Sequence, residues 1–130
     1  MSYEVDSVNH AVKTRVWGVM SDADALGHER RLIDDPSVPT NPRQIIDLRE
    51  VEGFDVTQDG MLRMVELDDA HAARLGEGMV AIVAPEDLMF GISRMFQIVT
   101  DSSPWQVGVF RTLYEARRWL DLPPETAPPQ

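Results

Sequence analysis

The chain has 130 residues, of which 43% are hydrophobic and 26% charged, and its formal net charge is -10. This length suits one domain with one core, and no apolar run approaches the roughly 20 residues that span a bilayer, so we expect no membrane insertion. The acidic balance disfavours nucleic-acid binding. The absence of cysteine excludes disulfides and thiolate metal sites, and an N-terminus without a secretory signal leads us to expect a cytoplasmic protein.

The first third of the chain predicts two strands and a helix. Residues 1–12 alternate loosely between apolar and polar positions and predict a short edge strand. Residues 15–20 are rich in β-branched and aromatic side chains and predict a second strand. Ser21 and the acidic residues after it predict a helix N-cap, and Pro36 ends that helix.

The middle of the chain predicts a strand, a helix and another strand. Residues 43–48 form a short apolar run of strand length, and the glycine at 53 begins a predicted turn over residues 53–55. Thr57 caps the helix that follows. Residues 79–84 are continuously apolar, as in a strand that is covered on both faces.

The last third predicts a helix, a strand and a closing helix. The helix begins at Glu86 and extends to about Thr100, and residues 105–110 predict the last strand. Apolar residues at three- and four-residue spacing mark the expected inner face of the first helix: Leu88, Ile92, Met95, Phe96 and Val99. The inner stripe of the closing helix is expected at Leu113, Ala116, Trp119 and Leu120.

This alternation predicts an α/β fold with a small mixed, mostly parallel sheet flanked by helices, built from βαβ repeats after an N-terminal edge strand. We expect residues 1–122 to form the single domain. The proline-rich residues 123–130 have no core to join and are expected to form a flexible tail.

Several short stretches carry a resemblance to a known family. They are residues 47–49, 90–95, 109–111, 115–116 and 119–120, taken together with the order of the predicted elements. In these features the chain resembles the SpoIIAA-like proteins, which are relatives of the STAS domains of anti-sigma-factor antagonists. The resemblance implies a small sheet flanked by helices and a generally non-enzymatic module that binds a protein partner, a nucleotide or an apolar ligand. We expect a regulatory module that acts through a protein partner or an apolar small ligand, without a cofactor. The resemblance does not decide whether the protein forms a homodimer.

The resemblance also draws attention to Thr57. STAS regulators carry a phosphorylatable serine in an Asp-Ser-Ser-Gly turn at the start of a helix, and Thr57 falls at the matching place, but the first serine and the glycine are missing. A phosphate there would face free N–H groups of a helix N-terminus. The alternative is that Thr57 is only an N-cap.

A calcium-binding module is an alternative function. Residues 55–66 resemble an EF-hand loop, in which Asp55, Thr57, Asp59 and Glu66 would be ligands and Gly60 would make the turn. The strand predicted before this loop stands where an EF-hand requires a helix. We therefore expect a coincidence of acidic residues rather than a metal site.

No set of catalytic residues is visible in the sequence. The histidines, His10, His28 and His71, are not at metal-ligand spacing from one another, and we expect them at the surface. An unrecognised small α/β enzyme remains a third class, which would require a deep pocket with converging polar groups and perturbed ionisation.

The helix over residues 86–100 offers a candidate surface. By helical periodicity Met89, Phe90 and Arg94 fall away from the apolar stripe, so we predict that they point outward and form a partner or ligand surface. The plainer alternative is that Phe90 is a single exposed aromatic ring that stacks on Arg94.

Overall fold

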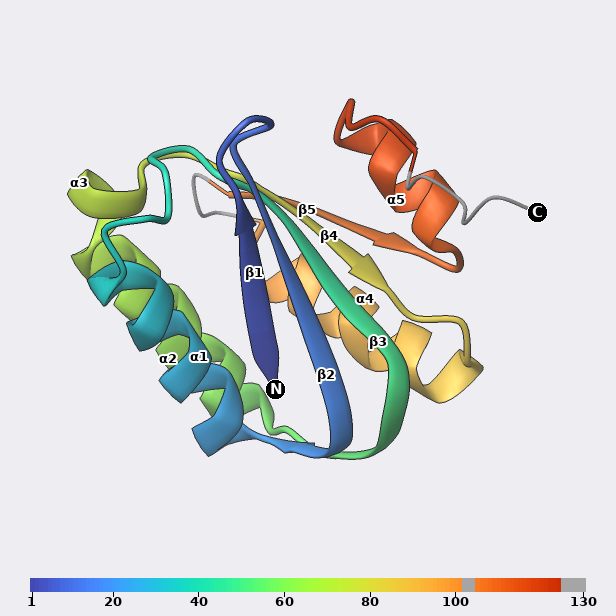
Figure 1. The fold of residues 1–130 in the computed structure, drawn as a ribbon. Coiled ribbons are helices and arrows are strands. Elements are labelled where there is room, and N and C mark those ends of the chain that lie inside the picture. The colour runs from blue at the N-terminus through green and yellow to red at the C-terminus, as the bar shows by residue number, and fades with distance from the viewer. Residues whose placement is uncertain (102–104, 125–130) are drawn as a thin grey trace.

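We describe the fold from a computed structural model, over residues 1–101 and 105–124. Within these residues a sheet of five strands has helices on both faces, as Figure 1 shows, which confirms the predicted fold class. The strands are β1 (Ser2–Asp6), β2 (Ala11–Ser21), β3 (Arg43–Asp55), β4 (Met79–Val83) and β5 (Gln106–Phe110). The helices are α1 (Asp22–Asp34), α2 (Gln58–Ala70), α3 (Ala72–Leu75), α4 (Asp87–Val99) and α5 (Leu113–Trp119).

The strands lie in chain order, β1-β2-β3-β4-β5. The edge strand β1 is antiparallel to β2, and every other neighbouring pair is parallel. Helices α1, α2 and α4 lie in the crossovers between parallel strands. Because such crossovers are right-handed and the order of the strands in the sheet never reverses, these helices all lie on one face of the sheet. Helix α5 covers the opposite face (Figure 1).

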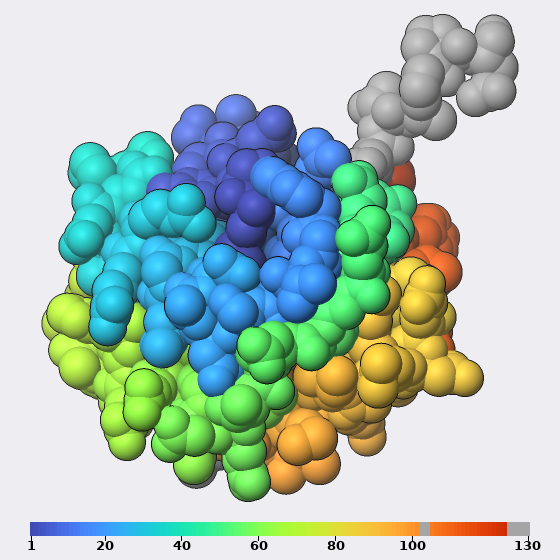
Figure 2. Space-filling view, turned by 90° about the horizontal axis from the view of Figure 1, so that it is seen from below, coloured from blue at the N-terminus to red at the C-terminus, as the bar shows by residue number. Residues whose placement is uncertain are grey.

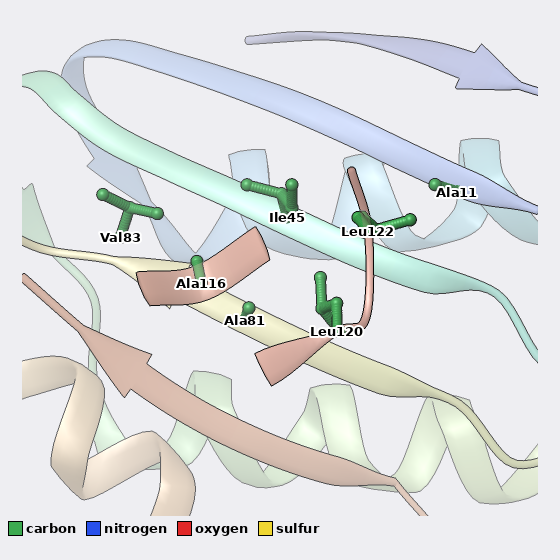
Figure 3. Close-up of a cluster of buried hydrophobic side chains, with 7 residues drawn as sticks. All are labelled: Ala11, Ile45, Ala81, Val83, Ala116, Leu120 and Leu122. Atoms are coloured by element: carbon green, nitrogen blue, oxygen red, sulfur yellow. The ribbon is translucent and has the colours of Figure 1, made fainter. Parts of the chain in front are cut away.

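The core under α5 is small and tightly closed. Figure 3 shows Ile45, Ala81 and Val83, which are odd-numbered strand residues, directed towards Ala116 and Leu120 of the closing segment. Ala116 is fully buried, as predicted. Strand side chains alternate between faces, so the even-numbered neighbours of these residues face the other layer.

The chain end follows this core. Leu122, the last residue of the predicted domain, is buried, whereas Pro123 and Pro124 are exposed. The rest of the predicted proline-rich tail, residues 125–130, lies outside the described residues.

Strands β2 and β3 are longer than the sequence predicts. The local signals end β3 near residue 48 and place a turn at Gly53, but the two strands pair with each other as far as Ser21 and Asp55. Strand β4 pairs with β3 only up to Asp47. Hydrogen bonding along the β2–β3 ribbon thus overrides the glycine, which is a tertiary effect that local propensity does not contain.

The starts of α1 and α2 lie side by side, as Figures 1 and 2 show. Ser21 and Asp24 form a capping box in α1, with each side chain accepting from the other residue's backbone N–H. Asp22, in the first turn of α1, accepts from both the backbone N–H and the hydroxyl of Thr57, at 2.9 and 2.6 Å. One carboxylate therefore ties the two helix starts together.

Candidate ligand-binding pocket

A cavity of about 100 Å³ lies between the sheet and the layer of α1, α2 and α4. The sheet contributes even-numbered side chains of β2, β3 and β4, namely Thr14, Val16, Ile46, Leu48, Val80 and Ile82. The helices contribute apolar side chains that include Ala25, Met61 and Phe96. Close-packed proteins keep few voids larger than a water molecule, so a space of this size within one small domain is a binding-site candidate.

A buried polar group interrupts the apolar wall at α1. Thr14 of β2 is fully buried, and its Oγ1 lies 3.1 Å from Nε2 of His28, whose side chain is 5% exposed. The ring of Tyr3 meets the His28 ring edge-on at 5.6 Å between centroids. Burial lowers the pKa of His28 to about 4, helped by the positive charge of Arg31. The imidazole is therefore neutral at neutral pH.

Two carboxyl groups share a hydrogen bond across α1 and α2. Burial raises the pKa of Glu29 well above its ordinary value, and the hydrogen bond to Asp68 and the charge of Asp68 add to this. The pKa of Asp68 is also raised by burial, while the bond from Glu29 acts in the opposite direction. These directions make Glu29 the group that keeps its proton and Asp68 the acceptor. Both residues line the cavity.

Two polar atoms of this cluster are buried without a hydrogen-bond partner among the described residues. They are Nδ1 of His28 and Oδ1 of Asp68. A buried donor or acceptor that lacks a partner costs about 1–3 kcal/mol, and natural proteins satisfy the great majority of such groups. His28 and Asp68 line the cavity, but these two atoms themselves have almost no accessible surface.

The structure orients α4 differently from the prediction. Met89 is 4% exposed and Phe90 packs against the same core cluster, whereas Leu88 is 70% exposed and Ile98 is 71% exposed. The predicted outward direction of Met89 and Phe90 is therefore wrong. Of the predicted surface residues, only Arg94 is exposed.

The physical reason is that α4 is apolar on nearly every side, so hydrophobicity alone does not choose its inner face. The inner stripe contains the polar residues Ser93 and Thr100, which are 4% and 3% exposed and line the cavity. The ring of Phe90 makes a cation–π contact with Arg111 rather than with Arg94. The Arg111 guanidinium lies 4.0 Å from the ring centroid.

Thr57 is the N-cap of α2, as predicted: its Oγ1 accepts from the backbone N–H of Gly60 at 3.0 Å. The same hydroxyl donates to Asp22. A phosphate on this oxygen would lie against the Asp22 carboxylate and would remove that bond. Phosphorylation of Thr57 stays a prediction, and this contact opposes it.

The residues of the calcium alternative are not assembled. Asp55 is the last residue of β3, so a strand precedes the loop where an EF-hand has a helix. Asp59 forms an ion pair with Arg63 at 3.0 Å, and Glu66 is exposed on α2. In the part of the chain that the structure describes, no group of three acidic or histidine side chains is placed to hold a metal ion.

The residues at the polar end of the pocket were not predicted from the sequence, and His28 was wrongly expected at the surface. The signal was present in the spacing of α1. Ala25, His28, Glu29 and Leu32, at i, i+3, i+4 and i+7, form one buried stripe. Two ionisable residues on the apolar stripe of a helix indicate a buried polar site.

Among the comparisons with known proteins, the comparison of structures identifies the fold. No protein-family model and no curated protein matches the chain. In structure the chain is similar to an uncharacterised protein of the DUF3478 family from Shewanella loihica PV-4, which has a SpoIIAA-like fold. The two chains are 16% identical, with a TM-score of 0.56 over 92% of this chain and 90% of that chain. The chain therefore has a SpoIIAA-like fold, as the resemblance implied.

Proposed function

We propose that the protein is a cytoplasmic, non-enzymatic regulatory module that binds an apolar small molecule between the sheet and α1, α2 and α4. The observation that carries this proposal is the cavity of about 100 Å³ with mostly apolar walls. Apolar cavities of comparable size in proteins bind small apolar molecules. Each methylene group that leaves water for such a site contributes about 0.8 kcal/mol.

The walls also suit a ligand of variable shape. Met20, Met61 and Met64 line the cavity. Methionine side chains are unbranched and polarisable, so they adjust to different apolar surfaces at small cost.

The fold supports a non-enzymatic role by analogy alone, because one fold hosts many functions. The described part of the chain contains no helix that could cross a membrane.

A small enzyme is the second candidate, because the pocket contains ionisable groups with shifted pKa values. Glu29 keeps a proton, which it could donate as a general acid. Thr14 and His28 form a hydroxyl–imidazole pair. However, Thr14 is 0% exposed, and a nucleophile has to touch its substrate. A buried hydroxyl that bonds a neutral histidine fits a binding site better than a reaction centre.

The test is native mass spectrometry of the protein purified from its own host. We expect a bound apolar compound that is released on denaturation, and the same spectrum reports whether a homodimer or a protein partner is present. Ser93→Leu, which puts a larger side chain into the cavity, is expected to abolish the bound mass, whereas the exposed neighbour Arg94→Gln retains it. Ala25→Leu is a second cavity-filling variant, should Ser93→Leu fail to fold.

Two outcomes would contradict the proposal. One is wild-type protein that carries no compound and gives no saturable binding of any apolar probe. The other is a bound compound that both cavity-filling variants retain at the wild-type level.

A further inference from the structure

Gln44 is a polar side chain in the sheet wall of the cavity, where its neighbours are apolar. The next residue of β3, Ile45, points towards α5 in Figure 3, so Gln44 points to the opposite face of the sheet. On that face Gln44 lines the cavity, and it is 3% exposed. Its register partners on the two neighbouring strands are Val12 and Val80. The sheet therefore offers the Gln44 amide no polar side chain at this register.

The amide of Gln44 makes no hydrogen bond within the part of the chain that the structure describes. Among those residues, the buried polar side-chain atoms that lack both a partner and accessible surface are Nδ1 of His28 and Oδ1 of Asp68. Neither Oε1 nor Nε2 of Gln44 belongs to this group, so both atoms retain some accessible surface. Because Gln44 is 3% exposed and lines the cavity, that surface faces the cavity.

This position would be more stable with an apolar side chain of the same shape. A buried polar group without a partner carries a desolvation penalty, whereas an apolar replacement of similar volume does not. Methionine matches glutamine in length and would pack between Val12 and Val80. A single polar side chain on the wall of an apolar cavity is typical of a ligand site, where it orients the ligand. Gln44 is therefore placed to bond a bound molecule.

The head groups of apolar molecules match a glutamine amide to different degrees. The amide presents an accepting carbonyl beside a donating NH₂, and rotation of the amide by half a turn exchanges the two. A carboxamide or a lactam presents the same two groups, so it makes two hydrogen bonds with the side chain in either orientation. An ester has no donor and leaves the Gln44 carbonyl unpaired. A carboxylate also has no donor, and it loses much hydration on burial.

Resting on the proposed function, we infer that Gln44 is the polar anchor of the pocket and selects an apolar molecule with a neutral amide group, such as a carboxamide or a lactam. The N–H of this group donates to the Gln44 carbonyl, and its carbonyl accepts from the Gln44 NH₂. The apolar walls of the cavity contact the rest of the molecule. Discrimination against esters and carboxylates comes from the Gln44 carbonyl, which only a donor satisfies.

The test compares hexanamide, methyl pentanoate and hexanoate, which have the same number of non-hydrogen atoms, by titration calorimetry at pH 7. We expect hexanamide to bind the wild-type protein at least about tenfold more tightly than either of the others, because only hexanamide satisfies both groups of the Gln44 amide. Gln44→Met keeps the length of the side chain and removes the amide, so the preference is expected to fall to about onefold. Gln106→Met, the same change at an exposed residue of β5, is the matched control and is expected to keep the wild-type preference.

The stability of the ligand-free protein separates a binding role of Gln44 from a structural role. In urea unfolding without ligand, we expect Gln44→Met to be at least as stable as wild type, because the change removes an unpartnered buried amide. A clear loss of stability or a failure to fold would show that the amide has a structural partner, and would overturn the inference. The comparison of the three compounds on the wild-type protein depends on no variant.

The outcomes also separate this inference from the proposed function. Methyl pentanoate or hexanoate bound as tightly as hexanamide, with loss of binding in Ser93→Leu, would overturn the role of Gln44 and leave the apolar pocket standing. The same preference in Gln44→Met as in wild type would also overturn that role. Failure of all three compounds to bind would overturn the inference together with the apolar pocket.

Discussion

The buried acid pair makes a specific prediction about stability and pH. Glu29→Gln keeps the shape of the side chain and an N–H that can donate to Asp68, but it removes the titration. Glu29 is 6% exposed, so solvent offsets little of the cost of ionising it in the folded state. Because the folded state raises the pKa of Glu29 well above 4.5, unfolding above this pH releases a proton. The contribution of Glu29 is full below the unfolded pKa and is lost as pH rises to the folded pKa.

Each pH unit within this window lowers the free energy of unfolding by about 1.4 kcal/mol, which corresponds to roughly 4–7 °C in Tm for a domain of this size. His28 acts with the opposite sign: its pKa is lowered to about 4, so its contribution is lost as pH falls from 6.5 towards 4. The two effects partly cancel in the wild-type protein below pH 6.5. Comparison of wild type with Glu29→Gln separates the acid pair of Glu29 and Asp68 from His28, because His28 is present in both proteins.

The assay is urea unfolding at pH 5 and pH 8. We expect the stability of Glu29→Gln, relative to wild type, to be more favourable at pH 8 than at pH 5. Glu66→Gln, an exposed change on α2, is expected to show the same difference at both pH values. A relative stability of Glu29→Gln that stays constant or falls with rising pH would refute the assigned protonation of the pair.

Two further predictions concern the helices. Gly60→Ala would place its Cβ into the carboxylate of Asp22, so we expect it to lower the free energy of unfolding by about 1–3 kcal/mol, measured by urea denaturation. Gly27→Ala meets no atom within 4 Å and is expected to stabilise α1 by up to about 1 kcal/mol; equal effects of the two changes would contradict this packing. Phe90→Ala is expected to cost about 2–3 kcal/mol and Arg94→Ala less than about 0.5 kcal/mol, by thermal unfolding. A larger loss of stability in Arg94→Ala than in Phe90→Ala would support the outward orientation of Phe90 that the sequence predicted.

The elements were predictable wherever their signals are local. Ser21 and Thr57 cap the helices that the sequence assigned to them, because capping depends on a few neighbouring residues. The apolar run at residues 79–84 forms a covered strand for the same reason. The length of β3 was not predictable in this way, because its second half depends on pairing with β2.

The spacing of α1 indicated a buried polar site, but the assembly of the pocket could not be predicted from the sequence, for a related reason. It forms where even-numbered strand residues meet three helices, and that meeting depends on topology rather than spacing. The buried face of α4 contains the polar residue Ser93, which hydrophobic periodicity assigns to the surface, whereas the spacing of α1 places His28 on the buried stripe. Polar residues on a buried helix face break the rule that buried faces are apolar. Such exceptions are expected at binding sites, and here they line the candidate pocket.

The most direct test of an apolar ligand pocket uses the tryptophans as reporters. Trp105 lines the cavity, Trp17 is 48% exposed on β2, and Trp119, the last residue of α5, packs against the core on the opposite face of the sheet. Titration of octanol into a protein that retains only Trp105 is predicted to give a saturable change in fluorescence, and a protein that retains only Trp17 is predicted to give none. No saturable change at Trp105, or the same change at Trp17, would contradict the account.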